Sequence, residues 1–472
     1  MKGVNEAELQ KLEAGTTKNQ KLQHSDGFKN AAALVYLSGG KKAYELFRSG
    51  CGANLPTIPT LQSWVQQNGV DIVEGLESLD KVAERMAKMY EEKKVDKLIF
   101  INEDATTVTV ALEYKSSTQQ IYGLVRKRHF GGHPEEIDQL KATAAKERAT
   151  HVYLYVGVNP FDENMPALPI GFFATDNKFK TQDVISNWKK ITEVFTKQGF
   201  HVIGYGADGD SRCIRAQSDH LRRARETIEK KHNKNFYQLQ LGEEHEDLPL
   251  LFYQDFLHLF MKMMRRIIKH YVLKFGSRMS NVGNLVRLSE RVAAAVSRAR
   301  HDPMSVSLAA KLLDPEIINE LKEGDEDQQV TALLLEHCKR IYDIASNSHL
   351  SFEDRVLNVW SVLFFSRLWL KSTERKLLVE KSAVSRKYDS MFTENILRGL
   401  QINSYSLLHV YIYCKEKNMK IAPWCLSSQY CENFFRLLRA FRKKTRSISP
   451  FSNVNNCFAI SSLKKAVIPT SK

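Results

Sequence analysis

The sequence predicts an α/β protein in which a mixed sheet with helices on it is interrupted by a large all-helical insertion. Two observations predict this class. Over residues 93–232, short apolar or β-branched runs alternate with amphipathic helices. Over residues 233–420, every periodic segment has helical spacing and no convincing strand is present. A helical region, 1–92, precedes the sheet, and 421–472 adds a last helix and a basic tail.

The N-terminal region is predicted to contain three helices. Helical spacing runs over Asn30–Arg48 and ends at a Gly-Cys-Gly segment, and a proline-marked loop precedes a short helix at Gln62–Gln67. Leu76–Glu92 carries apolar residues three and four positions apart, so we expect an amphipathic helix there.

The sheet region begins with three closely spaced strands that we expect to form a meander, and continues with strands that alternate with helices. The expected strands are Lys97–Asn102, Thr107–Tyr114, Gln119–Val125, His151–Val158, the weaker Ile170–Thr175, and His201–Ala207. The expected helices are Pro134–Ala149, Thr181–Gln198 and Ser211–Lys231.

The insertion is predicted to be a bundle of amphipathic helices, followed by one more helix that returns to the core. The insertion helices are Leu257–Val272, Val306–Leu313, Gln328–Ala345, Phe352–Leu370 and Ile402–Lys415, and the last helix is Ser427–Arg442.

The charge of the chain is basic and concentrated. Its 472 residues carry 69 Lys and Arg against 54 Asp and Glu, and segments 256–289 and 433–472 contain no acid at all. Clustered cations favour a phosphate backbone as partner, because binding releases condensed counterions. A solvated face or a nuclear import signal is the alternative. The candidate DNA contacts are Arg212, Arg215, Lys262, Arg265, Arg266, Arg436, Arg439, Arg442 and Lys443.

Several classes of protein are disfavoured by the sequence. The start of the chain has no apolar signal-peptide core, and the most apolar window, Leu250–Phe260, is too short and too polar to span a bilayer. Seven scattered cysteines form no CxxC pair, so we expect neither a zinc ribbon nor a disulfide framework, and a reducing, intracellular compartment is expected.

Three acidic residues occupy informative positions. Asp104 follows the first predicted strand, Asp208 follows the strand at 201–207, and Glu432 lies on the last helix. Acids at strand ends and on an adjacent helix can converge at one sheet edge, and oxygen ligands suit Mg²⁺. The plainer alternative is that loop aspartates form turns or cap helices.

Asp208 lies in a glycine-rich segment, from Gly204 to Gly209, that matches GxGxxG, the spacing of a dinucleotide-binding site. Asp208 and Asp210 argue against that interpretation, because they would face the anionic pyrophosphate.

At these residues the chain resembles the P element-type DNA transposases, through seven motifs that occur in order over most of its length. The motifs are Leu55-Pro56 with Thr60-Leu61; Asp104-Ala105-Thr106 with Glu113-Tyr114 and Gly123; Pro169-Ile170-Gly171-Phe172-Phe173; Asp208-Gly209-Asp210-Ser211; Asp255, His258, Leu259 and Lys262; Trp360, Phe364-Phe365, Arg367 and Trp369; and Gln429, Glu432-Asn433-Phe434-Phe435-Arg436.

The resemblance implies an RNase H-like core split by the helical insertion. It implies a DDE-type triad of Asp104, Asp208 and Glu432 that holds Mg²⁺ or Mn²⁺, and metal-dependent DNA cleavage and strand transfer in the nucleus. It also implies assembly as a homo-oligomer, and some relatives use a guanine nucleotide held by the insertion.

The sequence departs from the family at three places. Ala207 stands where Ser usually precedes the second acid, Arg265-Arg266 stands where an Arg-Asn pair is expected, and a single cysteine, Cys51, precedes Cys213, so no zinc-coordinating module is visible. The alternative function is therefore a domesticated, catalytically inactive transposase-derived protein that still binds DNA.

Overall fold

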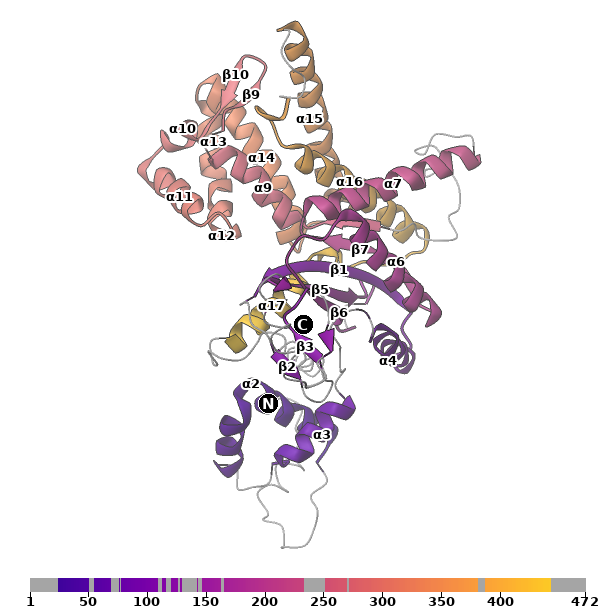
Figure 1. Ribbon diagram of the computed structural model, residues 1–472. Coiled ribbons are helices and arrows are strands. Elements are labelled where there is room, and N and C mark those ends of the chain that lie inside the picture. Colours follow the sequence, from indigo (N-terminus) through magenta and orange to yellow (C-terminus); the bar gives the residue numbers. More distant parts are fainter. Residues whose placement is uncertain are drawn as a thin grey trace, which may run out of the picture. The chain divides into compact units, whose positions relative to one another are not determined.

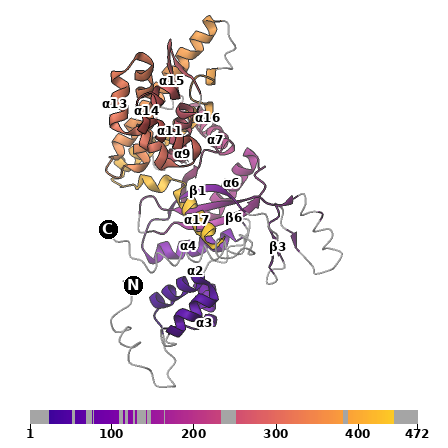
Figure 2. The same ribbon diagram turned by 90° about the vertical axis from the view of Figure 1, so that its left-hand side faces the viewer.

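The computed structural model describes most of the chain (Figures 1 and 2). The described residues are 24–50, 55–68, 76, 78–108, 113–115, 120–125, 128–129, 142, 147–162, 165–232, 251–269, 271–380 and 387–442. Most of the helix predicted over 134–149 lies outside these residues, as do the basic residues from 443 onward. None of the described helices is both long and apolar enough to cross a membrane.

The central element is a five-stranded mixed sheet, which confirms the predicted α/β class. Its order is β6-β5-β1-β7-β8. The strands are β1 (Leu98–Thr107), β5 (His151–Val158), β6 (Leu168–Thr175), β7 (His201–Ala207) and β8 (Leu251–Gln254). β1, β5 and β6 pair antiparallel in turn, and β7 pairs parallel with β8.

The chain forms two compact units, and the boundary between them crosses the sheet region. The first unit holds residues 1–179, 187–202 and 429–472, and the second holds 180–186 and 203–428. The first unit thus joins the N-terminal helices and part of the sheet to the last helix. The four-part division expected from the sequence stays a prediction.

The N-terminal helices form a small cluster of their own in the first unit. α2 (Asp26–Gly50) bends at Gly40, which has a φ of 79°, and α3 (Ile58–Asn68) packs against it. Ala33, Tyr44 and Leu61 are fully buried there. The Tyr44 hydroxyl donates to the Pro56 carbonyl at 2.7 Å, which fixes the loop between the helices. α4 (Leu79–Glu92) follows as an amphipathic helix, as predicted.

The predicted meander of the first three strands is wrong. β2 (Glu113–Lys115), β3 (Gln120–Tyr122) and β4 (Arg128–His129) form a separate three-stranded sheet. β1 instead pairs with β5 along eight residues, from Phe100 opposite Val158 to Thr107 opposite His151. The long apolar run of β5 is buried almost throughout, and such a strand belongs at the centre of a sheet covered on both faces.

Two helices cover this part of the sheet. α6 (Thr181–Lys197) follows β6, and α17 (Gln429–Arg442) packs against β1 and β5. Phe435 on α17 is fully buried, and Leu438 is nearly so. The last helix therefore returns to the sheet as the sequence predicts, although α17 begins two residues later than expected.

The second unit contains β8, most of β7 and the helices of residues 211–426. Its helices are α7 (Ser211–His232), α9 (Phe256–Ile268), α10 (Val282–Val286), α11 (Glu290–His301), α12 (Val306–Ala310), η1 (Lys311–Leu313), α13 (Pro315–Glu323), α14 (Glu326–Ser346), α15 (Phe352–Val379), α16 (Glu394–Glu416) and η3 (Pro423–Leu426).

The prediction that residues 233–420 contain no strand is wrong. β8 lies there, and β9 (Leu273–Phe275) pairs antiparallel with β10 (Arg278–Ser280). Segments of three or four residues are too short to show a period of two. The outer edge of β8 is paired with side chains of α16: Gln254 N donates to Asn403 Oδ1, and Asn403 Nδ2 donates to Gln254 O, both at 2.7 Å.

Candidate active site and nucleic-acid interface

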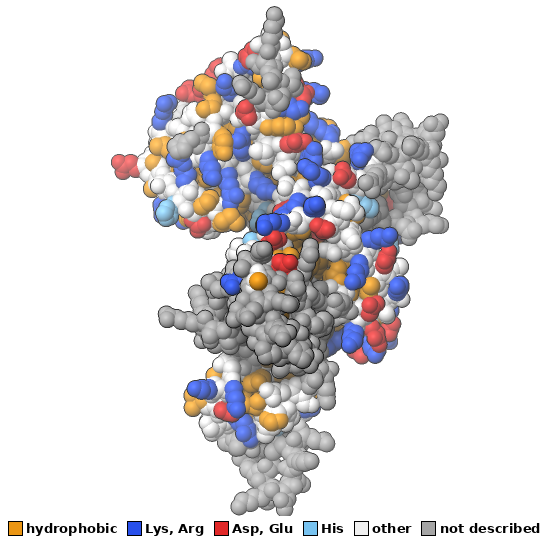
Figure 3. All heavy atoms as spheres, viewed as in Figure 1, with side chains coloured by type: hydrophobic (Ala, Val, Ile, Leu, Met, Phe, Trp, Pro, Cys, Tyr) orange, Lys and Arg blue, Asp and Glu red, His pale blue; other side chains and the backbone are white. Residues whose placement is uncertain are grey.

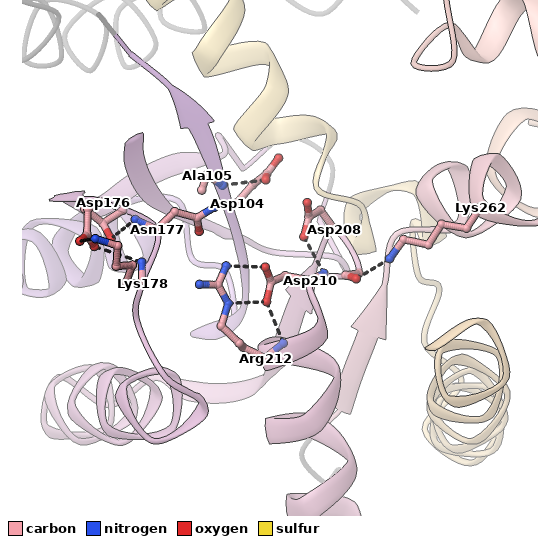
Figure 4. A network of polar contacts seen from close by, with 11 residues as sticks. Asp104, Ala105, Asp176, Asn177, Lys178, Asp208, Asp210, Arg212 and Lys262 are labelled. Carbon is pink, nitrogen blue, oxygen red and sulfur yellow. Dashed lines mark hydrogen bonds and ion pairs between the residues drawn. The ribbon is translucent and has the colours of Figure 1, made fainter. Parts of the chain in front are cut away.

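Asp104 lies inside β1 and not after its end, which corrects the expected position. β1 continues to Thr107. The Asp104 side chain is 5% exposed, and its Oδ1 accepts a hydrogen bond from Ala105 N at 2.7 Å. Figure 4 shows this carboxylate on the side of β1 where α17 runs. A buried carboxylate within a strand has a fixed direction, which a metal ligand requires.

The neighbouring acid, Glu103, faces the other side of the strand. Both of its carboxylate oxygens accept from Trp188 Nε1 on α6 at 3.1 Å. Because successive side chains of a strand point to opposite faces, Glu103 packs under α6 while Asp104 points away from it. Glu103 therefore has a structural contact with α6, whereas Asp104 lies on the face of β1 toward α17.

Glu432 lies in the first turn of α17, the helix that packs on β1 and β5. Its side chain is half-buried, between the buried Cys431 and the buried pair Phe434 and Phe435. Asp104 and Glu432 therefore belong to two contacting elements of one unit, although they are more than 300 positions apart in sequence.

Asp208 lies in a tight turn between β7 and α7. Its Oδ1 accepts from Asp210 N at 3.0 Å. Gly209 has a φ of 92°, in the region that favours glycine. A Cβ at this position would displace the Lys262 ammonium, which is the flexible end of a side chain, so the positive φ is the main reason for glycine in this turn.

Asp210 has a different role from Asp208, as Figure 4 shows. Arg212 Nε and Nη2 donate to its two carboxylate oxygens at 2.8 and 2.6 Å, and Arg212 N donates to Oδ1 at 2.7 Å. Burial raises the pKa of Asp210, but the Arg212 hydrogen bonds and charge outweigh burial and lower it overall. Asp210 is a helix-start acid that is already paired, which leaves Asp208 as the candidate ligand.

Lys262 on α9 supports the Asp208 turn. Its ammonium donates to the Gly209 carbonyl (Figure 4). Burial lowers the pKa of Lys262, whereas the charges of Asp208 and Asp210 act in the opposite direction. This cation, predicted from the sequence as a DNA contact, lies beside two carboxylates in the structure.

Asp255 connects the start of α9 to the segment that precedes α17. Its Oδ1 accepts from Leu257 N at 2.8 Å and His258 N at 3.1 Å, as a helix N-cap. Its Oδ2 accepts from Ser427 Oγ at 2.6 Å and from both N and Oγ of Ser428 at 3.1 Å. Motif spacing identified Asp255, but only the fold reveals the two serines.

The three predicted acids come from both units. Asp104 and Glu432 belong to the first, and Asp208 belongs to the second. Among the described residues, no three or more His, Cys, Asp or Glu side chains are grouped closely enough to hold a metal ion. The convergence of the triad stays a prediction. The donor set itself suits a hard cation, because all three ligands would be carboxylates.

The cations predicted to contact DNA fall into distinct groups. Arg215 and Arg436 are exposed, and Arg436 also contacts Asn433 Oδ1 at 3.1 Å. Arg212 pairs with Asp210, and Arg265 donates to Pro303 O. The structure does not describe the side chains of Arg439 and Arg442, and Lys443 lies outside the described residues.

Arg266 has a structural role. It is 9% exposed and donates to the carbonyls of Tyr388, Asp389 and Met391 at 2.7–3.1 Å, and it lies over the Tyr271 ring. A guanidinium engaged in this way holds the 388–391 segment and offers little to a phosphate.

Two of the three glycines of the GxGxxG spacing have structural explanations. A Cβ on Gly204 would collide with the backbone of Leu251 on β8, so this glycine permits the β7–β8 pairing. Gly209 permits the Asp208 turn.

The helical part of the second unit has a basic hollow of about 530 Å³. Lys and Arg side chains are numerous on the face of this unit drawn in Figure 3. The hollow is lined by Arg291, Arg298, Lys311 and Lys339 together with Asp314 and Tyr342. Arg291 pairs with Asp314 and Glu316, and Lys339 pairs with Asp343.

The fold is similar to that of a transposase. No protein-family model and no curated protein matches the chain. A solved structure, "Drosophila P element transposase strand transfer complex", matches with a TM-score of 0.61 over 96% of this chain and 95% of that chain, at 15% sequence identity. The chain therefore has a transposase-like fold over nearly its whole length.

Proposed function

We propose that this protein is a transposase-like enzyme that cleaves and joins DNA strands with the help of divalent cations. The observation that carries the proposal is the match of fold over 96% of the chain to a transposase in a strand transfer complex. The match extends through the insertion, so it concerns the whole arrangement and not only a common sheet core. The basic balance of the chain supports a DNA partner and, with it, a nuclear location.

In this proposal the sheet is an RNase H-like core, and Asp104, Asp208 and Glu432 are the catalytic acids. They would hold Mg²⁺ or Mn²⁺, which when bound supplies activation of the attacking oxygen and stabilisation of the leaving oxygen. The residues of the chain set the directions of these acids. β1 fixes Asp104, the Gly209–Lys262 contact fixes the turn that carries Asp208, and packing on β1 and β5 fixes α17.

DNA would contact the exposed cations near these acids. Arg215 lies one helical turn beyond Ser211, the first residue of α7, and Arg436 lies one turn beyond Glu432 on α17. Both side chains are exposed. Phosphate contacts from such positions would hold the strand beside the carboxylates and add to affinity without reading sequence.

The test is Mn²⁺-dependent nicking of supercoiled DNA by wild type and by Asp208→Asn. The matched control is Asp176→Asn. Asp176 also follows a strand, β6, but it pairs with Lys178 in a local turn, through Oδ1 at 3.0 Å and Oδ2 at 3.2 Å (Figure 4). We expect at least a 100-fold loss for Asp208→Asn and near wild-type nicking for Asp176→Asn. Equal activity of wild type and Asp208→Asn would refute the assignment.

A DNA-binding protein without catalytic turnover is the second candidate. Lys262 favours it, because its ammonium already places a positive charge beside Asp208 and Asp210, where a divalent ion would otherwise neutralise them. This candidate predicts salt-sensitive DNA binding that is the same with and without Mn²⁺, and no nicked product from the wild type.

The basic hollow of the insertion is our candidate for the guanine nucleotide that some relatives use. Among the described ion pairs, Arg298 and Lys311 are not engaged, which leaves two cations for phosphate groups. Fluorescent GTP binding should weaken about tenfold or more in Lys311→Gln, because one of the two cations for its phosphate groups is removed. Binding unchanged in both Lys311→Gln and Arg298→Gln would exclude the hollow.

A further inference from the structure

Lys262 of α9 binds the backbone of the turn that carries Asp208. Figure 4 shows its side chain reaching from α9 to this turn, where the ammonium donates to the Gly209 carbonyl. The residue is half-buried, and no ion pair joins it to a carboxylate within the described part of the chain. The contact of Lys262 is therefore with a peptide oxygen, although Asp208 and Asp210 stand on either side of Gly209.

The helix that carries Lys262 is fixed at both ends. Asp255 caps its first turn and also accepts hydrogen bonds from residues 427–428. In its last turn, Arg266 donates to carbonyls of residues 388–391. Most other side chains of α9 are buried. A lysine on a helix fixed in this way can determine the place of the turn that it binds.

A buried glutamine lies beside the same glycine. Gln254 is 2% exposed, and its Oε1 lies 3.3 Å from where a Cβ on Gly209 would stand, a point that the Lys262 ammonium also contacts. Among the described residues, this amide oxygen accepts no hydrogen bond. An ammonium has three N–H donors, and one of them binds the Gly209 carbonyl. The Gln254 oxygen therefore offers a second acceptor to the same ammonium.

The position of Gln254 is fixed by two other amides. Its Nε2 donates to Gln217 Oε1 of α7 at 2.6 Å, and its backbone exchanges two hydrogen bonds of 2.7 Å with Asn403 of α16. Gln217 Nε2 in turn donates to the carbonyls of Tyr205 and Tyr253 at 3.4 Å, on the paired strands β7 and β8. Because these contacts are buried, they hold the Gln254 side chain in one place.

We propose that Lys262 is a positioning residue for Asp208: its ammonium, beside the Gln254 amide oxygen, holds the Gly209 carbonyl and with it the direction of the Asp208 carboxylate toward a divalent cation. The inference rests on the proposed function, since it takes Asp208 as a metal ligand. All of these residues belong to the second unit. Residues that orient a ligand in this way commonly change metal affinity by about 10- to 100-fold.

The charge of Lys262 and its positioning act in opposite directions on a metal ion. A cation near Asp208 and Asp210 repels a second cation, so charge alone predicts that Lys262→Met binds Mn²⁺ more tightly. Positioning predicts weaker binding, because the turn loses the contact that fixes it. The sign of the change in Mn²⁺ affinity therefore distinguishes the two roles.

The first test is Mn²⁺ binding to the full chain without DNA, followed by the electron paramagnetic resonance signal of free Mn²⁺. Asp208→Asn defines the binding that depends on this acid. We expect the dissociation constant of that binding to rise about tenfold or more in Lys262→Met. Equal or tighter binding in Lys262→Met would overturn this inference alone, whereas a wild type without Asp208-dependent binding would refute the proposed function as well.

Lys376→Met is the matched control. The Lys376 ammonium also donates to the carbonyl of a glycine with positive φ, Gly276, at 3.2 Å, and that φ is 65°. This turn, between β9 and β10, carries none of the proposed acids. We expect Lys376→Met to bind Mn²⁺ as the wild type does. Equal weakening in Lys376→Met and Lys262→Met would overturn the inference, because the effect would not depend on the Asp208 turn.

DNA nicking is the second test, and it separates positioning from a partial loss of fold. In Lys262→Met, the Mn²⁺ concentration for half-maximal rate should rise about tenfold, while the rate at saturating Mn²⁺ stays close to that of the wild type. Lys262→Arg keeps a charged donor for the Gly209 carbonyl and should lie between the two. A lower maximal rate with an unchanged Mn²⁺ requirement would contradict positioning.

A double-mutant cycle tests the role of Gln254. Gln254→Met keeps a side chain of similar length and removes the acceptor, so it should weaken Mn²⁺ binding, but less than Lys262→Met does. In the Lys262→Met background the same change should have little further effect, because Gln254 acts through the ammonium. Equal effects of Gln254→Met in both backgrounds would refute its part in the proposal.

Discussion

The carboxylate of Asp255 bonds to Ser428, 173 positions further along the chain, at 3.1 Å from both the backbone nitrogen and the hydroxyl. The same carboxylate caps α9 through its other oxygen. One buried acid thus joins the start of α9 to the segment that precedes α17, the helix that carries Glu432. The two segments, 255–258 and 427–428, are thus held together by the hydrogen bonds of a single buried side chain.

Asp255→Asn should destabilise the protein by about 2–4 kcal/mol, because an amide cannot accept all the hydrogen bonds that the buried carboxylate accepts. The comparison is Asp325→Asn, at an exposed cap of α14, which should cost about 1 kcal/mol or less. Urea unfolding measures both. An equal cost would mean that the bonds to Ser427 and Ser428 add nothing.

Gly209→Ala should be costly because of both its positive φ and the proximity of Lys262. The backbone contribution is about 1–2 kcal/mol, and loss of the hydrogen bond from the displaced Lys262 ammonium to the Gly209 carbonyl adds a smaller amount. Gly276, with a φ of 65° and nothing within 4 Å of an added Cβ, is the control for backbone strain alone. In a double-mutant cycle, Gly209→Ala should cost less unfolding free energy in the Lys262→Ala background than in the wild type. Additive costs of the two substitutions would contradict a contact between Lys262 and Gly209.

His337 should make the protein sensitive to mild acid. Burial lowers the pKa of His337 from 6.5 to about 4, and its ring is stacked on Phe365 at 4.0 Å. Between these pH values His337 is protonated in the unfolded chain but neutral in the folded chain. The free energy of unfolding therefore falls as pH decreases from about 6.5 to 4. The loss should be roughly 2–3 kcal/mol.

His337→Phe removes this titration and keeps a flat ring against Phe365. Thermal unfolding between pH 7 and 4 should therefore show a smaller decrease in melting temperature for the variant than for wild type. Parallel curves would show that another group controls the acid sensitivity.

Asp210 should also contribute stability that is lost in acid, at a lower pH than the His337 effect. Because Arg212 lowers its pKa in the folded state, the contribution is present above the unfolded value of about 3.8 and is lost as pH falls through the lower folded value. The difference in unfolding free energy between wild type and Asp210→Asn should be constant from pH 7 to 5 and shrink below pH 4. A difference that grows with acid would contradict the ion pair.

Arg215→Gln should reduce the slope of log K for DNA binding against log salt by about one, since one phosphate contact is removed. Arg266→Gln, which alters a cation held inside the fold, should leave that slope unchanged while it lowers stability. Fluorescence anisotropy at several salt concentrations distinguishes the two. A change of slope in Arg266→Gln alone would reverse the assignment of these residues.

The sequence predicted the strands at 151–158 and 201–207 to the residue, because each is a continuous apolar run with clear breaks at both ends. It predicted the helix of residues 352–370 but not its extension to Val379, where the outer face continues with exposed Leu378 and Val379. The short strands β8, β9 and β10 were missed, because pairing with distant partners and not local periodicity makes them strands.

What the sequence alone determined is the class of protein, the order of the parts and the identity of the candidate acids, because local periodicity and residue type are encoded in neighbouring positions. Only the tertiary structure decided that β1 pairs with β5, that Glu103 accepts from Trp188 on one face of β1 while Asp104 lies on the other face, and that Lys262 supports a turn. Those contacts join residues separated by tens to hundreds of positions, and they are selected by burial and hydrogen bonding in the folded chain, which no local pattern contains.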